Sequence, residues 1–251
     1  MDSSKKNGAF QHAPTRRVKP IHLLMGLHFN KCYKTEEENA SKFGCDEKTF
    51  RQWSWFMLKA MAKLDKKIIK WKNRFIKSEG GNRAFVSIDG VHFGIQEPSP
   101  FDPSYKSHKL EGAAVAYELV VSIATGYIVG YNGPFPAGKW PDLNIFRNKT
   151  KRKLLRFEHA IADRGYRGDP KILTPYEANN RQHANAMSVI RARHETINRR
   201  LRTWNALANN YRHRRHDHHF FFRASIVLEQ IKIENGNPPF QIYTYTDPFR
   251  F

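Results

Sequence analysis

The sequence predicts an α/β or α+β domain with a mixed sheet, preceded by a small helical region of helix-turn-helix outline. Apolar, strand-like runs dominate residues 84–162, whereas residues 20–75 and the chain after residue 184 show helical periodicity. Hydrophobic residues make up 40% of the 251-residue chain, which suffices for a packed core. The chain has neither an apolar run as long as a membrane span nor a signal-peptide core, so we expect an intracellular protein.

The helical region is expected over residues 20–79, after a loose polar tail over residues 1–19. A first helix starts behind Pro20. Thr35 is followed three residues later by Glu38, as in a capping box, and this second helix should end at Gly44. Asp46 then caps a third helix with an apolar spacing of three or four residues, formed by Phe50, Trp53, Met57, Met61 and Leu64.

Helix, glycine turn and helix together form the outline of a helix-turn-helix motif, although two helices of any small bundle give the same pattern. The chain carries 43 Lys and Arg against 23 Asp and Glu, a net charge of +20. This excess favours a polyanionic partner, so we favour the DNA-binding interpretation, while a membrane surface or a ribosome would suit the same charge. Lys48 and Arg51 would then lie near the start of the recognition helix, with Trp53 and Met57 packed inside.

The second domain is expected over residues 84–233, behind a boundary at residues 80–82, with a C-terminal extension over residues 234–251. Its first strand covers residues 84–88 and is buried on both faces, with Asp89 at its C-terminal end. Residues 91–95 are a candidate partner strand. A hairpin, a further strand and two helices follow, at residues 117–131, 157–162, 184–209 and 222–233.

Two aspartates stand out because each follows an apolar strand and lies next to or near a glycine. If the strands are adjacent, Asp89 and Asp163 lie a few Å apart and repel each other unless cations neutralise them. Mg²⁺ prefers such oxygen ligands, and pairs of these ions support phosphodiester chemistry. Aspartates at strand ends are nevertheless common, so the spacing alone favours a structural role for each of them.

Four segments strengthen this interpretation by their order along the chain. They are residues 87–92, residues 132–142 with Phe146 shortly after, residues 161–166, and residues 191–201. This ordered set resembles the DDE endonuclease domain of the PIF/Harbinger transposases and their domesticated nuclease relatives. One departure is clear, since Trp140 and Pro141 precede Asp142 where the family usually has a small residue and His.

The resemblance implies an RNase H-like fold, a central mixed sheet with helices on both sides. It implies that Asp89, Asp163 and Glu195 are a catalytic triad that binds Mg²⁺ or Mn²⁺, with Asp142 as a fourth acidic metal position. We favour Asp163 over Asp142 for the triad because Asp163 ends a strand. Asp142 suits the N-cap of the helix entered at Leu143.

Glu195 is the acid that the residues support least on their own. It lies away from the apolar stripe of its helix, and from the residues alone we favour a surface ladder with Arg191 and Arg199 over metal binding. Metal binding would require this helix to be covered on both sides and its arginines to meet DNA phosphates. Arg191, Arg199 and Arg202 of this helix are therefore predicted DNA contacts. Lys106 and Lys109, with His108 beside them, precede the hairpin and are further predicted contacts with the nucleic-acid backbone.

A histidine cluster near the C-terminus offers a second candidate site. Four histidines within seven residues suggest zinc, but the arginines among them would repel a cation and no cysteine is near. We favour a solvated or phosphate-facing basic turn, comprising Arg212, His213, Arg214, Arg215, His216, His218 and His219.

The sequence thus predicts a metal-dependent endonuclease or transposase acting on double-stranded DNA, namely transposon ends and a target. Two alternatives stay open: a catalytically silent, transposase-derived DNA-binding protein, and a basic RNA- or ribosome-associated module. The resemblance also raises a separate Myb-like DNA-binding partner and a homo-oligomer, which the residues do not decide. If the source is eukaryotic, we expect a nuclear protein, since basic runs at residues 15–19 and 149–153 suit nuclear signals.

Overall fold

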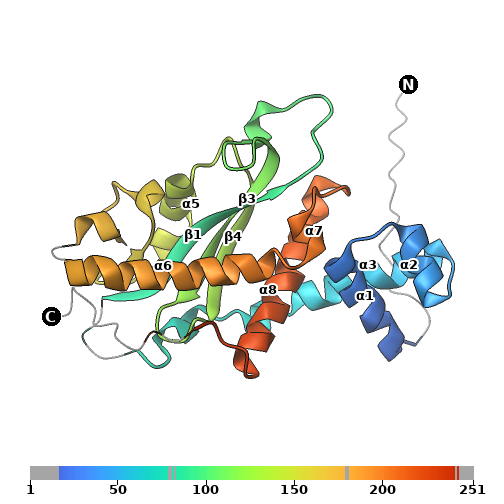
Figure 1. The fold of residues 1–251 in the computed structure, drawn as a ribbon, viewed down its shortest axis with the longest axis horizontal. Coiled ribbons are helices and arrows are strands. Elements are labelled where there is room, and N and C mark those ends of the chain that lie inside the picture. Colours follow the sequence, from blue (N-terminus) through green and yellow to red (C-terminus); the bar gives the residue numbers. More distant parts are fainter. Residues whose placement is uncertain (1–16, 79–80, 82, 179–180, 241, 243–251) are drawn as a thin grey trace.

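The computed structural model describes residues 17–78, 81, 83–178, 181–240 and 242, and Figure 1 shows its fold. The described residues form a six-stranded mixed sheet. β1 pairs antiparallel with β3 and parallel with β5, β3 pairs antiparallel with β2 and β4, and β5 pairs parallel with β6. The strands are β1 (Ala84–Gly94), β2 (Lys106–Ser107), β3 (Gly112–Ser122), β4 (Ile128–Pro136), β5 (His159–Ile161) and β6 (Ile172–Leu173).

Helices precede the sheet and pack on both of its faces, so the predicted mixed sheet flanked by helices, behind a helical region, is confirmed. In Figure 1 the long helix α6 runs across one side of the sheet, and α5 lies on the other side. The helices are α1 (Pro20–Cys32), α2 (Glu36–Phe43), α3 (Glu47–Lys63), α4 (Asp65–Ile68), α5 (Asp142–Asn148), α6 (Arg181–Leu201), α7 (Asn205–Ala208) and α8 (His218–Glu234).

The two faces of the sheet can be followed along β1, because successive strand residues point to opposite sides. Val86 and Ile88 pack in one hydrophobic cluster with Phe146 of α5. Val91 belongs to another cluster that contains Ile197 of α6. Odd-numbered residues in the middle of β1 therefore face α6, and even-numbered ones face α5.

The helical region and the sheet domain share one hydrophobic cluster. Phe29 of α1 meets Phe221 of α8 with ring centroids 5.4 Å apart, and Trp55 of α3 meets the same ring at 5.3 Å. A buried ion pair between Arg74 and Glu158 adds a second connection, with Nε and Oε1 2.7 Å apart. The expected boundary at residues 80–82, of which the structure describes Gly81, thus separates chain segments that pack on each other.

The first strand differs from its prediction. β1 continues through Asp89 to Gly94, so Asp89 lies within the strand, opposite Leu119, and the expected partner at residues 91–95 is part of the same strand. Gly90 does not end the strand. Its missing side chain instead makes room for Asp142, whose Oδ2 would lie 2.7 Å from a Cβ at this position.

Local signals in the helical region are confirmed. Thr35 and Glu38 form the capping box, Gly44 ends α2 with φ at +61°, and Asp46 caps α3 by accepting from the Thr49 amide. Of the expected α3 stripe, the side chains of Phe50, Trp53 and Met61 are buried, Met57 is half-buried and Leu64 is exposed.

The C-terminal half contains shorter and longer elements than expected. The helix expected to reach residue 209 ends at Leu201 and is followed by α7, while α8 starts at His218, earlier than predicted. None of the described helices combines the length and apolar composition that a membrane crossing needs. The predicted tail falls largely on residues 1–16, and much of the C-terminal extension on residues 241 and 243–251, all outside the described residues.

Candidate active site

A small cavity brings the three predicted triad acids together. Asp89, Asp163 and Glu195 all line a cavity of about 90 Å³. Asp89 comes from the middle of β1, Asp163 from the segment after β5, and Glu195 from α6. Because β1 and β5 are adjacent parallel strands and α6 packs across them, acids that lie between 32 and 106 positions apart in the chain meet at one place. The remaining lining residues are Ser87, Ile88, Arg191 and His194.

Asp89 is held in a single orientation on the α6 face. Asn198, one turn after Glu195, donates from Nδ2 to Asp89 Oδ2 at 2.7 Å. Burial raises the pKa of Asp89 to about 6; the charge of Lys109 opposes this shift, and the charges of Asp163 and Asp142 add to it. A cation in the cavity would relieve this repulsion, and Asp89 Oδ1 is the oxygen that Asn198 leaves free.

Asp163 begins a single 3-10 turn (Arg164–Tyr166) directly after the strand segment. Its Oδ1 accepts a hydrogen bond from the Gly165 amide at 2.9 Å, which fixes the carboxylate beside the cavity. The Ala-Asp-Arg-Gly-Tyr segment is thus a turn in which Asp163 Oδ1 accepts the Gly165 hydrogen bond and Oδ2 is left for a ligand. Tyr166 is fully buried, as expected for a packed aromatic.

Glu195 reaches the cavity from the edge of α6. Among the described ion pairs, none joins Glu195 to Arg191 or Arg199, so the alternative surface ladder is not formed. The condition set for metal binding, that α6 be covered on both sides, is not met, because Glu195 and Arg199 are exposed. Coverage is unnecessary for contact with the cavity, since the glutamate borders the packed face of the helix.

Asp142 lies on the other face of the sheet. Its Oδ2 forms an ion pair with Lys109 Nζ at 2.8 Å, and the same Nζ donates to the Gly90 carbonyl oxygen at 2.9 Å. His92, an even-numbered β1 residue, also faces Asp142, with Nε2 4.0 Å from Oδ1. The sheet therefore separates Asp142 from Asp89. The predicted N-cap role is wrong, because Pro141 takes that position and Asp142 is the first residue of α5.

The predicted DNA-contact residues fall into two groups. Arg51 forms an ion pair with Glu36, Lys109 pairs with Asp142, and Arg202 donates to the His92 carbonyl oxygen at 3.3 Å. These three cationic side chains are thus engaged in ion pairs or hydrogen bonds within the protein. The others are accessible: Arg191 borders the acidic cavity, and Lys48, Lys106, His108 and Arg199 are exposed.

The histidine cluster is not a metal centre. His218 is buried with Nδ1 2.8 Å from the Tyr117 hydroxyl, and His213 stacks on Phe221 with centroids 6.1 Å apart. Only His216 of these three is exposed. Across the described residues, no group of three or more His, Cys, Asp or Glu side chains is arranged to hold a metal ion as it stands. That statement applies to the acids of the cavity as well.

The comparison with known families decides the class of this domain. Residues 88–229, more than half of the chain, match the family described as DDE superfamily endonuclease. The chain belongs to this family. A solved structure, a Mos1 transposase paired-end complex with left transposon end, is similar at 13% identity over 89% of this chain and 79% of that chain, with a TM-score of 0.20. No curated protein matches the sequence.

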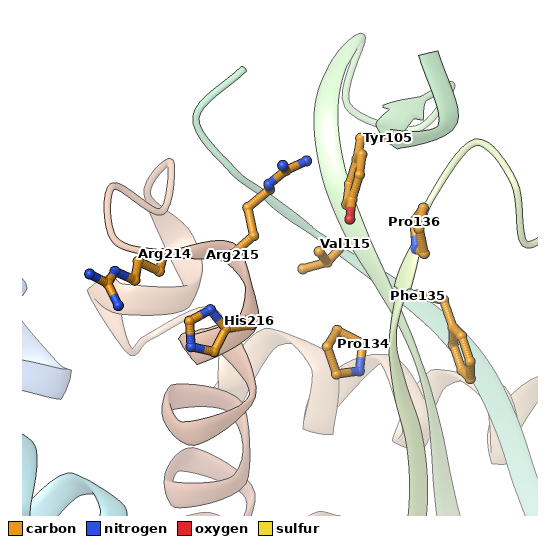
Figure 2. A pocket seen from close by; sticks show the side chains of 8 residues that line it. All are labelled: Tyr105, Val115, Pro134, Phe135, Pro136, Arg214, Arg215 and His216. Atoms are coloured by element: carbon orange, nitrogen blue, oxygen red, sulfur yellow. The ribbon is translucent and has the colours of Figure 1, made fainter. Parts of the chain in front are cut away.

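The DDE domain has a second, larger hollow away from its acids. It measures about 500 Å³, and its lining contains no carboxylate. Figure 2 shows arginines and a histidine on one side and the apolar residues of β3 and β4 on the other. The guanidinium of Arg215 lies 4.8 Å from the centre of the Tyr105 ring. The full lining is Tyr105, Val115, Pro134, Phe135, Pro136, Arg214, Arg215 and His216.

Sequence reasoning missed three residues around the acids of the DDE domain: Ser87, His194 and Asn198. The alternation of a strand would have found Ser87, since it lies two residues before Asp89 and shares its face. Helical spacing would have placed Asn198 beside Glu195. No pattern singles out His194, a buried side chain whose pKa is lowered to about 3 by burial, so its ring is neutral.

Proposed function

We propose that this chain is a metal-dependent DNA endonuclease of the PIF/Harbinger transposase type, with Asp89, Asp163 and Glu195 as its catalytic triad. The observation that carries the proposal is the convergence of these three acids on one cavity in a DDE superfamily domain. They come from three different elements, and no local sequence pattern requires them to meet. A common role in binding one cation site would explain why these three acids lie together.

The residues of the cavity fit a hard divalent cation. Their carboxylates offer the oxygen ligands that Mg²⁺ and Mn²⁺ take, and the raised pKa of Asp89 reflects burial and uncompensated negative charge. Two such ions, when bound, activate a water or a DNA 3′-hydroxyl and neutralise charge on the phosphodiester. The chain's own groups hold the ligands: Asn198 orients Asp89, and the Gly165 amide orients Asp163.

Asp142 takes a supporting role in this proposal. Lys109 bridges it to the Gly90 carbonyl oxygen, directly after Asp89, so the pair braces the strand from the face opposite the cavity. We therefore assign Asp142 to positioning, and we assign the metal ligands to the three acids on the cavity side.

Double-stranded DNA is the proposed substrate. The net charge of +20 suits a polyanion, and the larger hollow offers Arg214 and Arg215, which form no ion pair among the described residues. Lys48 at the start of α3, Lys106 and Arg199 are exposed and supply further phosphate contacts. A recognition role for α3, a Myb-like partner and a homo-oligomer stay predictions from the family resemblance.

The decisive experiment is nicking of supercoiled plasmid in Mn²⁺, with and without a chelator. We expect Asp89→Asn, Asp163→Asn and Glu195→Gln each to lower the nicking rate by at least about 100-fold while DNA binding is kept. Glu37→Gln, on the exposed surface of α2, is the matched control for Glu195→Gln and should change nothing. Undiminished nicking in the triad variants refutes the assignment. DNA binding without any nicking by the wild-type chain supports the silent DNA-binding protein, and a preference for RNA supports the third class.

A further inference from the structure

The cavity of the three acids also contains an imidazole that the triad does not use. His194 is 2% exposed and lines the cavity beside Asp89, Asp163 and Glu195. Its Nδ1 lies 2.9 Å from Ser87 Oγ. Its Nε2 is buried and has no hydrogen-bond partner. Buried polar atoms without partners are rare in folded proteins, so this nitrogen requires an explanation.

Ser87 allows the tautomer in which Nδ1 carries the hydrogen. The Ser87 hydroxyl can donate to the Val121 carbonyl oxygen at 3.4 Å, and its oxygen can then accept from His194 Nδ1 at 2.9 Å, which is the arrangement that we infer. A neutral imidazole has one N–H, so Nε2 then carries a lone pair. Metal-binding histidines usually have this arrangement: one ring nitrogen binds the metal, and the other donates its hydrogen to a fixed oxygen.

The other cavity groups explain why the lone pair lacks a partner. Ionised carboxylates accept hydrogen bonds and do not donate them, so Asp89, Asp163 and Glu195 cannot satisfy Nε2, and Arg191, a possible donor in the same lining, forms no hydrogen bond with it. A cation satisfies the nitrogen and the carboxylates together. Ser87 and Asp89 share one face of β1, two residues apart, and His194 and Glu195 are neighbours on α6, so nitrogen and oxygen donors border the same cavity.

We infer that His194 Nε2 is a ligand of the divalent cation that the triad binds, and that Ser87 holds it in place. The inference rests on the proposed function, because it concerns the same cation. A nitrogen ligand favours transition-metal ions such as Mn²⁺ over Mg²⁺, which takes oxygen ligands. The chain therefore discriminates between these two ions through one residue outside its triad.

Electron spin echo envelope modulation of Mn²⁺ bound to the full chain tests this directly. We expect ¹⁴N modulation from a directly bound imidazole, replaced by ¹⁵N modulation when the chain is made with ¹⁵N-histidine. His194→Gln should remove the modulation and weaken Mn²⁺ binding more than Mg²⁺ binding. Ser87→Ala should weaken Mn²⁺ binding roughly 10-fold or more, and Ser87→Thr, which keeps the hydroxyl, should restore it.

The outcomes separate the two proposals. Mn²⁺ that binds in an Asp89-dependent manner but shows no histidine modulation overturns the role of His194 and leaves the proposed function standing. Mn²⁺ binding that Asp89→Asn does not weaken, or no binding at all, overturns both. The isotope experiment uses the wild-type chain, so the answer does not depend on how well a His194 variant folds.

Discussion

Replacing Gly90 with alanine tests how closely α5 approaches the central strand. A Cβ at residue 90 would lie 2.7 Å from Asp142 Oδ2 and closer still to Oδ1 and Cγ. The carboxylate has little room to move, because the side chain is 13% exposed and its Oδ2 is held by Lys109 Nζ at 2.8 Å. Either β1 or the start of α5 must shift to accommodate the methyl group.

The expected cost follows from two contributions. Forcing an extra methyl group into a packed site costs about 1–3 kcal/mol. Loss of the Lys109–Asp142 ion pair adds less than about 1 kcal/mol, because the lysine is half-exposed and water screens the pair. We therefore expect Gly90→Ala to lower the free energy of unfolding by about 2–3 kcal/mol. Gly112→Ala in β3 is the matched control, since the nearest atom to its Cβ would be the Leu110 carbonyl oxygen at 3.8 Å.

Urea unfolding of a double-mutant cycle measures the effect. In an Asp142→Ala background the obstructing carboxylate is absent, so Gly90→Ala should cost less than about 0.5 kcal/mol there. The difference between the two backgrounds is the energy of the clash. An equal cost of Gly90→Ala in both backgrounds would refute the reasoning, because strand propensity or backbone entropy would then explain the loss.

Three further predictions concern stability. Burial raises the pKa of Glu118 to about 7, although hydrogen bonds from Thr150 and Asn132 oppose the shift. The folded chain therefore keeps a proton that the unfolded chain loses, so stability should fall as pH rises from about 4.5 to 7, and Glu118→Gln should flatten that slope in urea titrations. Removing one partner of the buried Arg74–Glu158 pair should cost about 3–5 kcal/mol, whereas Arg74→Met with Glu158→Leu should recover most of it; a double variant as unstable as the single ones contradicts this. Thr35→Ala should lower the free energy of unfolding by about 1 kcal/mol through loss of the α2 cap, and an unchanged thermal midpoint would show that the cap contributes nothing.

Much of the fold follows from short-range signals. The Thr35 capping box, the Gly44 terminus and the Thr125-Gly126 hairpin were all predictable, because each depends on groups within about five residues of one another. The length of β1 was not predictable in the same way. A glycine after an acid usually suggests a strand end, and only the approach of Asp142 from another element explains why Gly90 lies inside the strand.

The candidate site likewise has features that were predictable from the sequence and features that were not. The sequence by itself determined the identity of the acids, their order, and the turn that presents Asp163, since these are properties of contiguous residues. Only the tertiary structure decided that Glu195 joins Asp89 in one cavity and that Asp142 lies across the sheet. The physical reason is that strand pairing and helix packing, acting between segments about 100 residues apart, set which face each side chain occupies. His194 belongs to the same class, because its significance arises from Ser87 on a strand more than 100 residues away.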